Sequence, residues 1–113
     1  VISTSSGSTA YSLSAGGAIV APNAGVFAIT PICPHTLSNR AVIVSQQSTV
    51  EVRMLDQRRE ATLSADGWDV VGLDADSPVT INRSRRTVKL ARLPETSFFQ
   101  TLRQKLQWMG SHA

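Results

Sequence analysis

The sequence predicts a mainly β domain with a β-sandwich-like core, one short helix near its beginning and one amphipathic helix at its end. Hydrophobic residues make up 42% of the 113 residues but aromatic residues only 5%, and this supply of small, β-branched side chains favours strands. Short apolar runs recur at intervals of roughly ten residues, as in a sandwich or barrel. The length suits one domain over residues 1–113.

The first elements are a strand at residues 1–4 and a polar turn around Gly7. A short helix at residues 10–15 should follow, because Ser8 or Thr9 can cap its first turn. The two glycines after it should end it.

Several short strands are expected in the next part of the chain. The clearest lies at residues 49–55, where apolar and polar side chains alternate and give one buried and one wet face. Pro31 and Pro34 bracket an extended segment that cannot be helical. Shorter β-prone runs lie at residues 18–20, 26–30 and 41–44.

Asp66-Gly67 predicts a two-residue hairpin turn, because this dipeptide readily adopts the positive φ angles that such turns need. The hairpin would join residues 61–65 to 68–71, the candidate partners of the strand at 49–55. A further alternating pair is expected at residues 79–81 and 88–90.

The chain should end in an amphipathic helix after Pro94. Ser97 and Gln100 have the spacing of a capping box. Apolar residues then repeat every three or four positions: Phe99, Leu102, Leu106 and Met109.

Composition argues against several functions. The net charge is only +3, and the basic residues are not interleaved with aromatic ones, so nucleic acid is a poor partner. No apolar stretch approaches the roughly 20 residues that span a bilayer, and neither a membrane nor a targeting signal is expected. Cys33 is the one cysteine, which predicts a reducing, cytoplasmic setting. One cysteine and two widely separated histidines do not have the spacing of a zinc site, so no metal site is expected.

The most informative segment is the run TSSGSTAYSLSAGG at Thr4–Gly17. Gly7 would let the backbone approach a ligand closely, and the helix start offers N–H groups to an anion. Tyr11 adds a flat face for stacking, and several hydroxyls add small donors and acceptors. Residue chemistry alone leaves two interpretations open: a nucleotide-binding turn, or a Ser/Gly-rich loop that only caps a helix.

This run resembles the signature Thr-Pro-Thr-Gly-Ser-Thr-Ala-Tyr-Ser of NAD kinases, which a Gly-Gly pair follows. The register is kept, with a departure at Ser5, where the family usually has proline. Residues 29–38, Asp66-Gly67 and the closing FFQTLRQKLQW are also similar to family blocks, so the likeness covers essentially the whole chain.

The resemblance implies the C-terminal domain of a cytosolic enzyme that moves the γ-phosphoryl of ATP, or polyphosphate, to the 2′-hydroxyl of the adenosine ribose of NAD. The product is NADP. It also implies a homo-oligomer, a dimer or a tetramer, and a divalent cation such as Mg²⁺ in the full enzyme.

The same resemblance assigns a nucleotide-binding wall to six residues: Ser6, Thr9, Ala10, Tyr11, Ser14 and Cys33. Tyr11 would pack on the adenine, and the two residues before it would line the same pocket. The two serines would supply polar contacts. Cys33 lies in a stretch that, in the family, often approaches NAD across a subunit boundary.

No catalytic residue is expected in this chain. The family provides catalysis with a Gly-Gly-Asp-Gly-Thr motif and an Asn-Glu or Asn-Asp pair in an N-terminal α/β domain, and no such run occurs here. We therefore expect half of a two-domain enzyme, inactive alone, with its last helix packed on the N-terminal domain. Two alternatives stay open: the matching domain of a related lipid or diacylglycerol-type kinase, which should lack Tyr11, and a non-enzymatic β-sandwich oligomerisation module.

Overall fold

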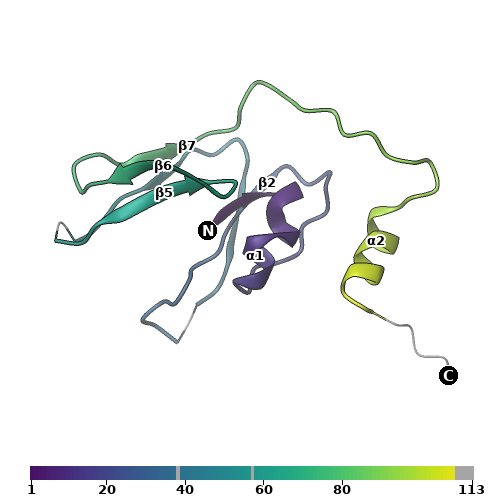
Figure 1. The fold of residues 1–113 in the computed structure, drawn as a ribbon, viewed down its shortest axis with the longest axis horizontal. Helices are drawn as coiled ribbons and strands as arrows, with labels where there is room; N and C mark the ends of the chain where they lie inside the picture. The colour runs from purple at the N-terminus through teal and green to yellow at the C-terminus, as the bar shows by residue number, and fades with distance from the viewer. Residues whose placement is uncertain (38, 57, 109–113) are drawn as a thin grey trace. The chain divides into compact units, whose positions relative to one another are not determined.

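The computed structural model describes residues 1–37, 39–56 and 58–108 (Figure 1). It is mainly β, as the sequence predicts, with three small open sheets and few helices. The chain divides into two compact units, Val1–Ser45 with Arg85–Ala113, and Gln46–Ser84. Each unit is described by itself.

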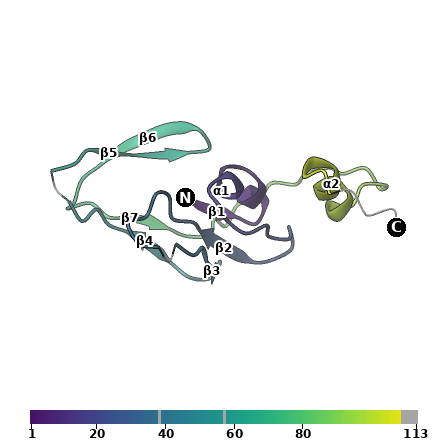
Figure 2. The same cartoon turned by 90° about the horizontal axis from the view of Figure 1, so that it is seen from below.

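The first unit contains a three-stranded antiparallel sheet in the order β1 (Ile2–Thr4), β2 (Val26–Ile29) and β3 (Val42–Ser45). Figure 2 shows these strands side by side, with α1 on one side of them. Because β2 is the central strand, its residues Phe27 and Ala28 are buried and form much of the core. The ladder continues one residue beyond β1 and β2, where Val1 and Thr30 exchange backbone hydrogen bonds.

A 3₁₀ helix, η1 (Ser6–Thr9), follows β1 directly, and a single turn of α-helix, α1 (Tyr11–Ser14), follows η1. Neither Ser8 nor Thr9 caps α1, so that prediction is wrong. The N-cap is Ala10, which has no side-chain acceptor. The predicted end is confirmed, because Gly16 has a φ of 91° and its N–H donates to the Leu13 carbonyl.

The predicted strand at residues 18–20 does not form. Its backbone is held instead by a side chain, since the Val20 N–H donates to Ser8 Oγ. The proline-bracketed segment is a series of bends without helix, as expected. Within it Cys33 has a φ of 47°, in the left-handed region that few non-glycine residues adopt.

The second unit holds two two-stranded antiparallel sheets. The hairpin prediction is confirmed: β5 (Ala61–Ala65) and β6 (Trp68–Leu73) pair through Asp66-Gly67, whose φ angles are 50° and 84°. The other pairings were predicted wrongly. The strand expected at residues 49–55 is only β4 (Val50–Val52), and it pairs with β7 (Val79–Ile81). Residues 88–90 form no strand, and the partner of β7 is β4.

The terminal helix α2 spans Phe98–Lys105, and Ser97 caps it as predicted, with Oγ accepting the Gln100 N–H at 3.1 Å. Leu102 is buried, but Phe99 is 69% exposed, so the inward face begins at Phe98 rather than Phe99. Met109, the last residue of the predicted stripe, lies outside the described residues. Within the described ranges, the structure contains no helix that is both long and apolar enough to cross a membrane.

Candidate functional site

The segment Thr4–Gly17 has two chemically similar faces that differ in burial. On the inner face, Ser8 and Ser12 are 0% and 1% exposed. On the outer face lie five of the six residues predicted to bind nucleotide, all of them exposed: Ser6, Thr9, Ala10, Tyr11 and Ser14. These five residues are accessible to solvent, whereas the side chains of Ser8 and Ser12 are not.

Ser8 fixes the segment to the chain that follows it. Its hydroxyl donates to the Ser5 carbonyl at 2.8 Å and accepts the Val20 N–H at 3.0 Å. A buried backbone N–H without an acceptor is costly, so this serine replaces the strand partner that residues 18–20 lack. Its role is structural.

Ser12 and Thr30 join α1 to the end of β2. Their hydroxyl oxygens are 3.1 Å apart, and both side chains are buried. Gly17 packs against this pair, since a Cβ built on it would lie 2.5 Å from Ser12 Oγ and 2.7 Å from Thr30 Oγ1. Glycine is therefore required at position 17 by close packing, and not by a left-handed φ.

The outer face combines an exposed ring with a glycine that the fold does not demand. Tyr11 is 64% exposed, so much of its aromatic side chain is accessible to a ligand. A Cβ on Gly7 would meet Ser3 Cβ at 3.5 Å and Thr4 Oγ1 at 3.6 Å, which are ordinary contacts, and Gly7 has no positive φ. No neighbour within the described chain explains the glycine.

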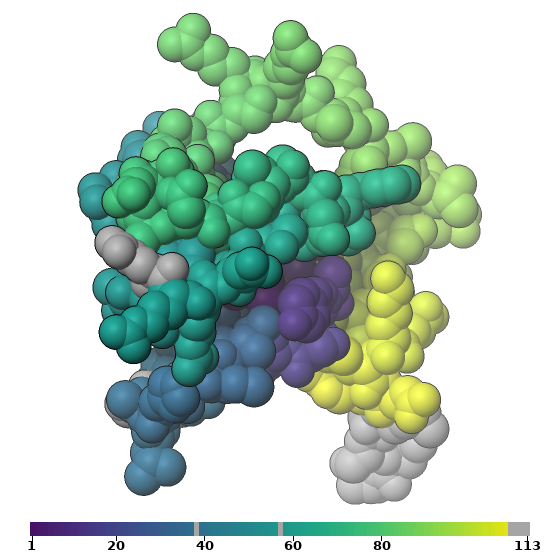
Figure 3. All heavy atoms as spheres, turned by 60° about the vertical axis from the view of Figure 1, so that its left-hand side comes forward, coloured from purple at the N-terminus to yellow at the C-terminus, as the bar shows by residue number. Residues whose placement is uncertain are grey.

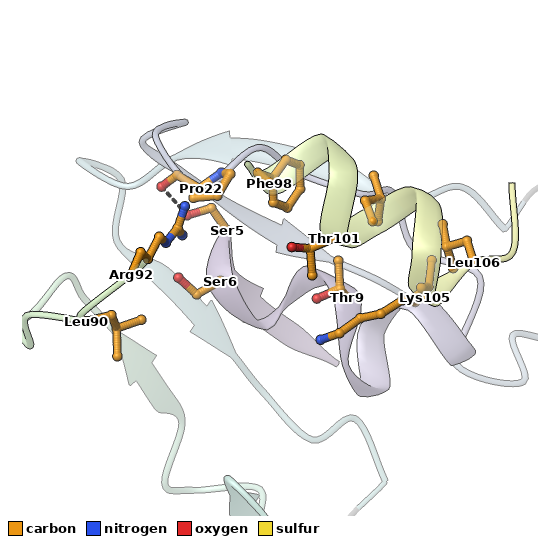
Figure 4. Close-up of a pocket in the computed structure, with 12 residues that line it drawn as sticks. Ser5, Ser6, Thr9, Pro22, Leu90, Arg92, Phe98, Thr101, Lys105 and Leu106 are labelled. Carbon is orange, nitrogen blue, oxygen red and sulfur yellow. Dashed lines mark hydrogen bonds between the residues drawn. The ribbon is translucent and has the colours of Figure 1, made fainter. Parts of the chain in front are cut away.

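A cavity of about 230 Å³ lies between η1 and α2, both in the first unit. Figure 3 shows α2, in yellow, beside the purple segment that carries the run. Of the predicted residues, Ser6 and Thr9 line this cavity. The remaining lining residues are Ser5, Leu13, Pro22, Leu90, Arg92, Phe98, Thr101, Leu102, Lys105 and Leu106 (Figure 4).

Two cations in this lining, Arg92 and Lys105, were not among the predicted site residues. Lys105 could have been found, because it lies three residues after Leu102 and so shares a face with that buried position. Arg92 carries no such signal, since it follows an irregular stretch without periodicity. No carboxylate lines the cavity.

The structure leaves the other candidates apart from this cavity. Cys33 is exposed and does not line the cavity. Asp66 occupies a hairpin turn. Across the described ranges, no three His, Cys, Asp or Glu side chains gather in a way that could hold a metal ion.

Comparison with known proteins agrees with this architecture. The family model for the ATP-NAD kinase C-terminal domain matches residues 1–93. NAD kinases of Sulfurimonas denitrificans and Chlorobium limicola are 44% and 42% identical over 96% and 100% of this chain. The chain spans only 37% and 39% of their lengths.

A solved structure is similar as well. The crystal structure of yeast NADH kinase complexed with NADH superposes with a TM-score of 0.79 at 29% identity, covering 99% of this chain and 36% of that one. The family model, the relatives and the fold agree. The chain belongs to the NAD kinase family and corresponds to the C-terminal domain of its members.

Proposed function

We propose that this chain supplies the NAD-binding wall of an enzyme that phosphorylates the 2′-hydroxyl of the adenosine ribose of NAD to give NADP. The observation that carries the proposal is the outer face of Thr4–Gly17, where an exposed tyrosine stands among small polar side chains on a scaffold fixed by buried hydroxyls. Such a surface is preorganised, so that binding does not have to order it first.

Each residue of this wall has its own proposed contact with the dinucleotide. The Tyr11 ring stacks on the adenine, with Thr9 and Ala10 beside it. The exposed hydroxyls of Ser6 and Ser14 make polar contacts with the dinucleotide. Gly7 has room around it that the fold does not use, which suits the close approach of a ligand to the backbone. Cys33 contributes from its exposed bend, across a subunit boundary.

The chemical step belongs to residues outside this chain. Phosphoryl transfer needs a group that orients or deprotonates the attacking hydroxyl and a cation that spreads phosphate charge. The described residues hold no carboxylate cluster for that cation. We assign Mg²⁺ and the catalytic groups to an N-terminal domain in a cytoplasmic enzyme whose phosphoryl donor is ATP or polyphosphate. We expect this chain alone to convert no NAD.

Self-association is a second role favoured by one observation. The edge strand β3 exposes Val42 and Ile43 at 53% and 46%. An exposed edge with apolar side chains is suited to contact with another chain. This surface fits a homo-oligomer, a dimer or a tetramer. The lipid-kinase alternative is disfavoured by a different feature, because the ligand domain of such a kinase should lack Tyr11.

The decisive test of the binding role is a calorimetric titration of the chain with NAD and with NADP. Tyr11→Ala should weaken binding about tenfold, because stacking of a base on an aromatic ring contributes roughly 1–3 kcal/mol. Tyr11→Phe keeps the ring and should bind as the parent chain does. Equal affinities for the parent chain and Tyr11→Ala would refute the assignment of this face.

A further inference from the structure

The cavity between η1 and α2 carries positive charge that nothing in the described chain neutralises. Arg92 and Lys105 are its charged lining residues, and both side chains are exposed. The ion pairs Arg53–Glu51 and Arg59–Asp56 do not involve this cavity. Two cations in one concave site without a carboxylate favour an anionic ligand.

The rest of the lining is suited to the same kind of ligand. Hydroxyls of Ser6, Thr9 and Thr101 line the cavity and can donate to anionic oxygens. In Figure 4 the Lys105 side chain extends from α2 toward Thr9, and the Arg92 guanidinium lies near Ser5. The two cations thus approach the cavity from different elements.

The size of the cavity limits what can enter. Its volume of about 230 Å³ is below the roughly 300–1,000 Å³ typical of sites that enclose a drug-sized molecule. The cavity is too small to enclose a whole dinucleotide, and its size is closer to that of a short phosphate chain. Such a chain offers several anionic oxygens, which the arginine can bind bidentately and the lysine as a point charge.

We propose that this cavity is a subsite for a di- or triphosphate group, bound by Arg92 and Lys105 with the hydroxyls of Ser6 and Thr9. The subsite deepens the proposed function and rests on it in one respect, because Ser6 and Thr9 belong to both. The phosphate group comes either from the dinucleotide or from the phosphoryl donor.

The test is a calorimetric titration of the chain with inorganic pyrophosphate, tripolyphosphate and NAD at low ionic strength. Lys105→Gln should weaken binding of pyrophosphate or tripolyphosphate about tenfold, as expected for loss of a charge-assisted hydrogen bond. Lys105→Arg should restore it. Arg103→Gln is the matched control, because it removes the same charge from the same helix at a residue that does not line the cavity.

Comparison of the NAD and pyrophosphate titrations distinguishes the two sources of the phosphate group, the dinucleotide and the phosphoryl donor. A loss of NAD affinity in Lys105→Gln as large as the loss for pyrophosphate assigns the subsite to the dinucleotide, and unchanged NAD affinity assigns it to the donor. An equal loss in Arg103→Gln, or no loss in Lys105→Gln, overturns the subsite. Lysine-dependent pyrophosphate binding without any NAD binding leaves the subsite standing and refutes the proposed function.

Discussion

The inner and outer faces of Thr4–Gly17 carry the same type of side chain, serine, but the serines differ in burial and in hydrogen bonding. Ser8 and Ser12 are buried and make hydrogen bonds that hold the segment to the sheet and to Val20. Ser6 and Ser14 are exposed to solvent. Since both pairs lie within the nine positions from Ser6 to Ser14, a serine-rich run can stabilise the fold with some of its hydroxyls and leave others exposed to solvent.

This difference teaches how the motif should respond to substitution. Changes on the inner face should lower stability, because they leave buried polar groups without partners or force atoms together. Changes on the outer face should leave stability almost unchanged and affect ligand binding alone. Substitutions ranked by their expected loss of stability test this division between the inner and outer faces.

The largest effect is expected from Gly17→Ala. The new Cβ would lie within 2.7 Å of Ser12 Oγ, the Ser12 carbonyl oxygen and Thr30 Oγ1. The two hydroxyl oxygens are joined by a buried hydrogen bond. Overpacking of this kind should lower the free energy of unfolding by about 2–3 kcal/mol, measured by urea denaturation. Gly72→Ala is the control, because nothing lies within 4 Å of its Cβ, and it should cause no loss. Equal stability of the two variants would show that the packing around Gly17 relaxes freely.

Ser8→Ala should have the next largest effect. It removes the acceptor of the buried Val20 N–H, and a buried donor left unpaired costs about 1–3 kcal/mol. Hydrogen exchange at the Val20 amide should accelerate accordingly. Ser6→Ala changes an exposed serine in the same turn and should leave both the unfolding midpoint and this exchange rate unchanged. A similar destabilisation by both changes would contradict the division into two faces.

Much of the fold follows from local sequence chemistry. The Asp66-Gly67 turn, the Ser97 cap and the end of α1 at Gly16 were predictable, because each depends on the conformational preferences of one or two residues. The mainly β class followed from the spacing of apolar runs. These features need no information about distant parts of the chain.

The features that sequence reasoning missed depend on distant contacts. The pairing of β4 with β7 skips a whole hairpin, and alternation along a strand does not identify its partner. Ser8 was expected to cap α1, but its hydroxyl bonds a residue twelve positions away. Likewise, α2 and an irregular stretch bring Lys105 and Arg92 to the same cavity, which no local pattern indicates.

The smallest effect is expected from Ser14→Ala, compared with Ser12→Ala in the same turn of α1. Ser14 is exposed, and alanine has the higher helix propensity, so stability should change by no more than about 0.5 kcal/mol. Ser12→Ala strips Thr30 Oγ1 of its buried partner and should cost about 1 kcal/mol. Thermal unfolding of the two variants measures both changes. If Ser14→Ala proved the more damaging of the two, the outer face would have a structural role, and its exposure could no longer be taken as evidence for a ligand.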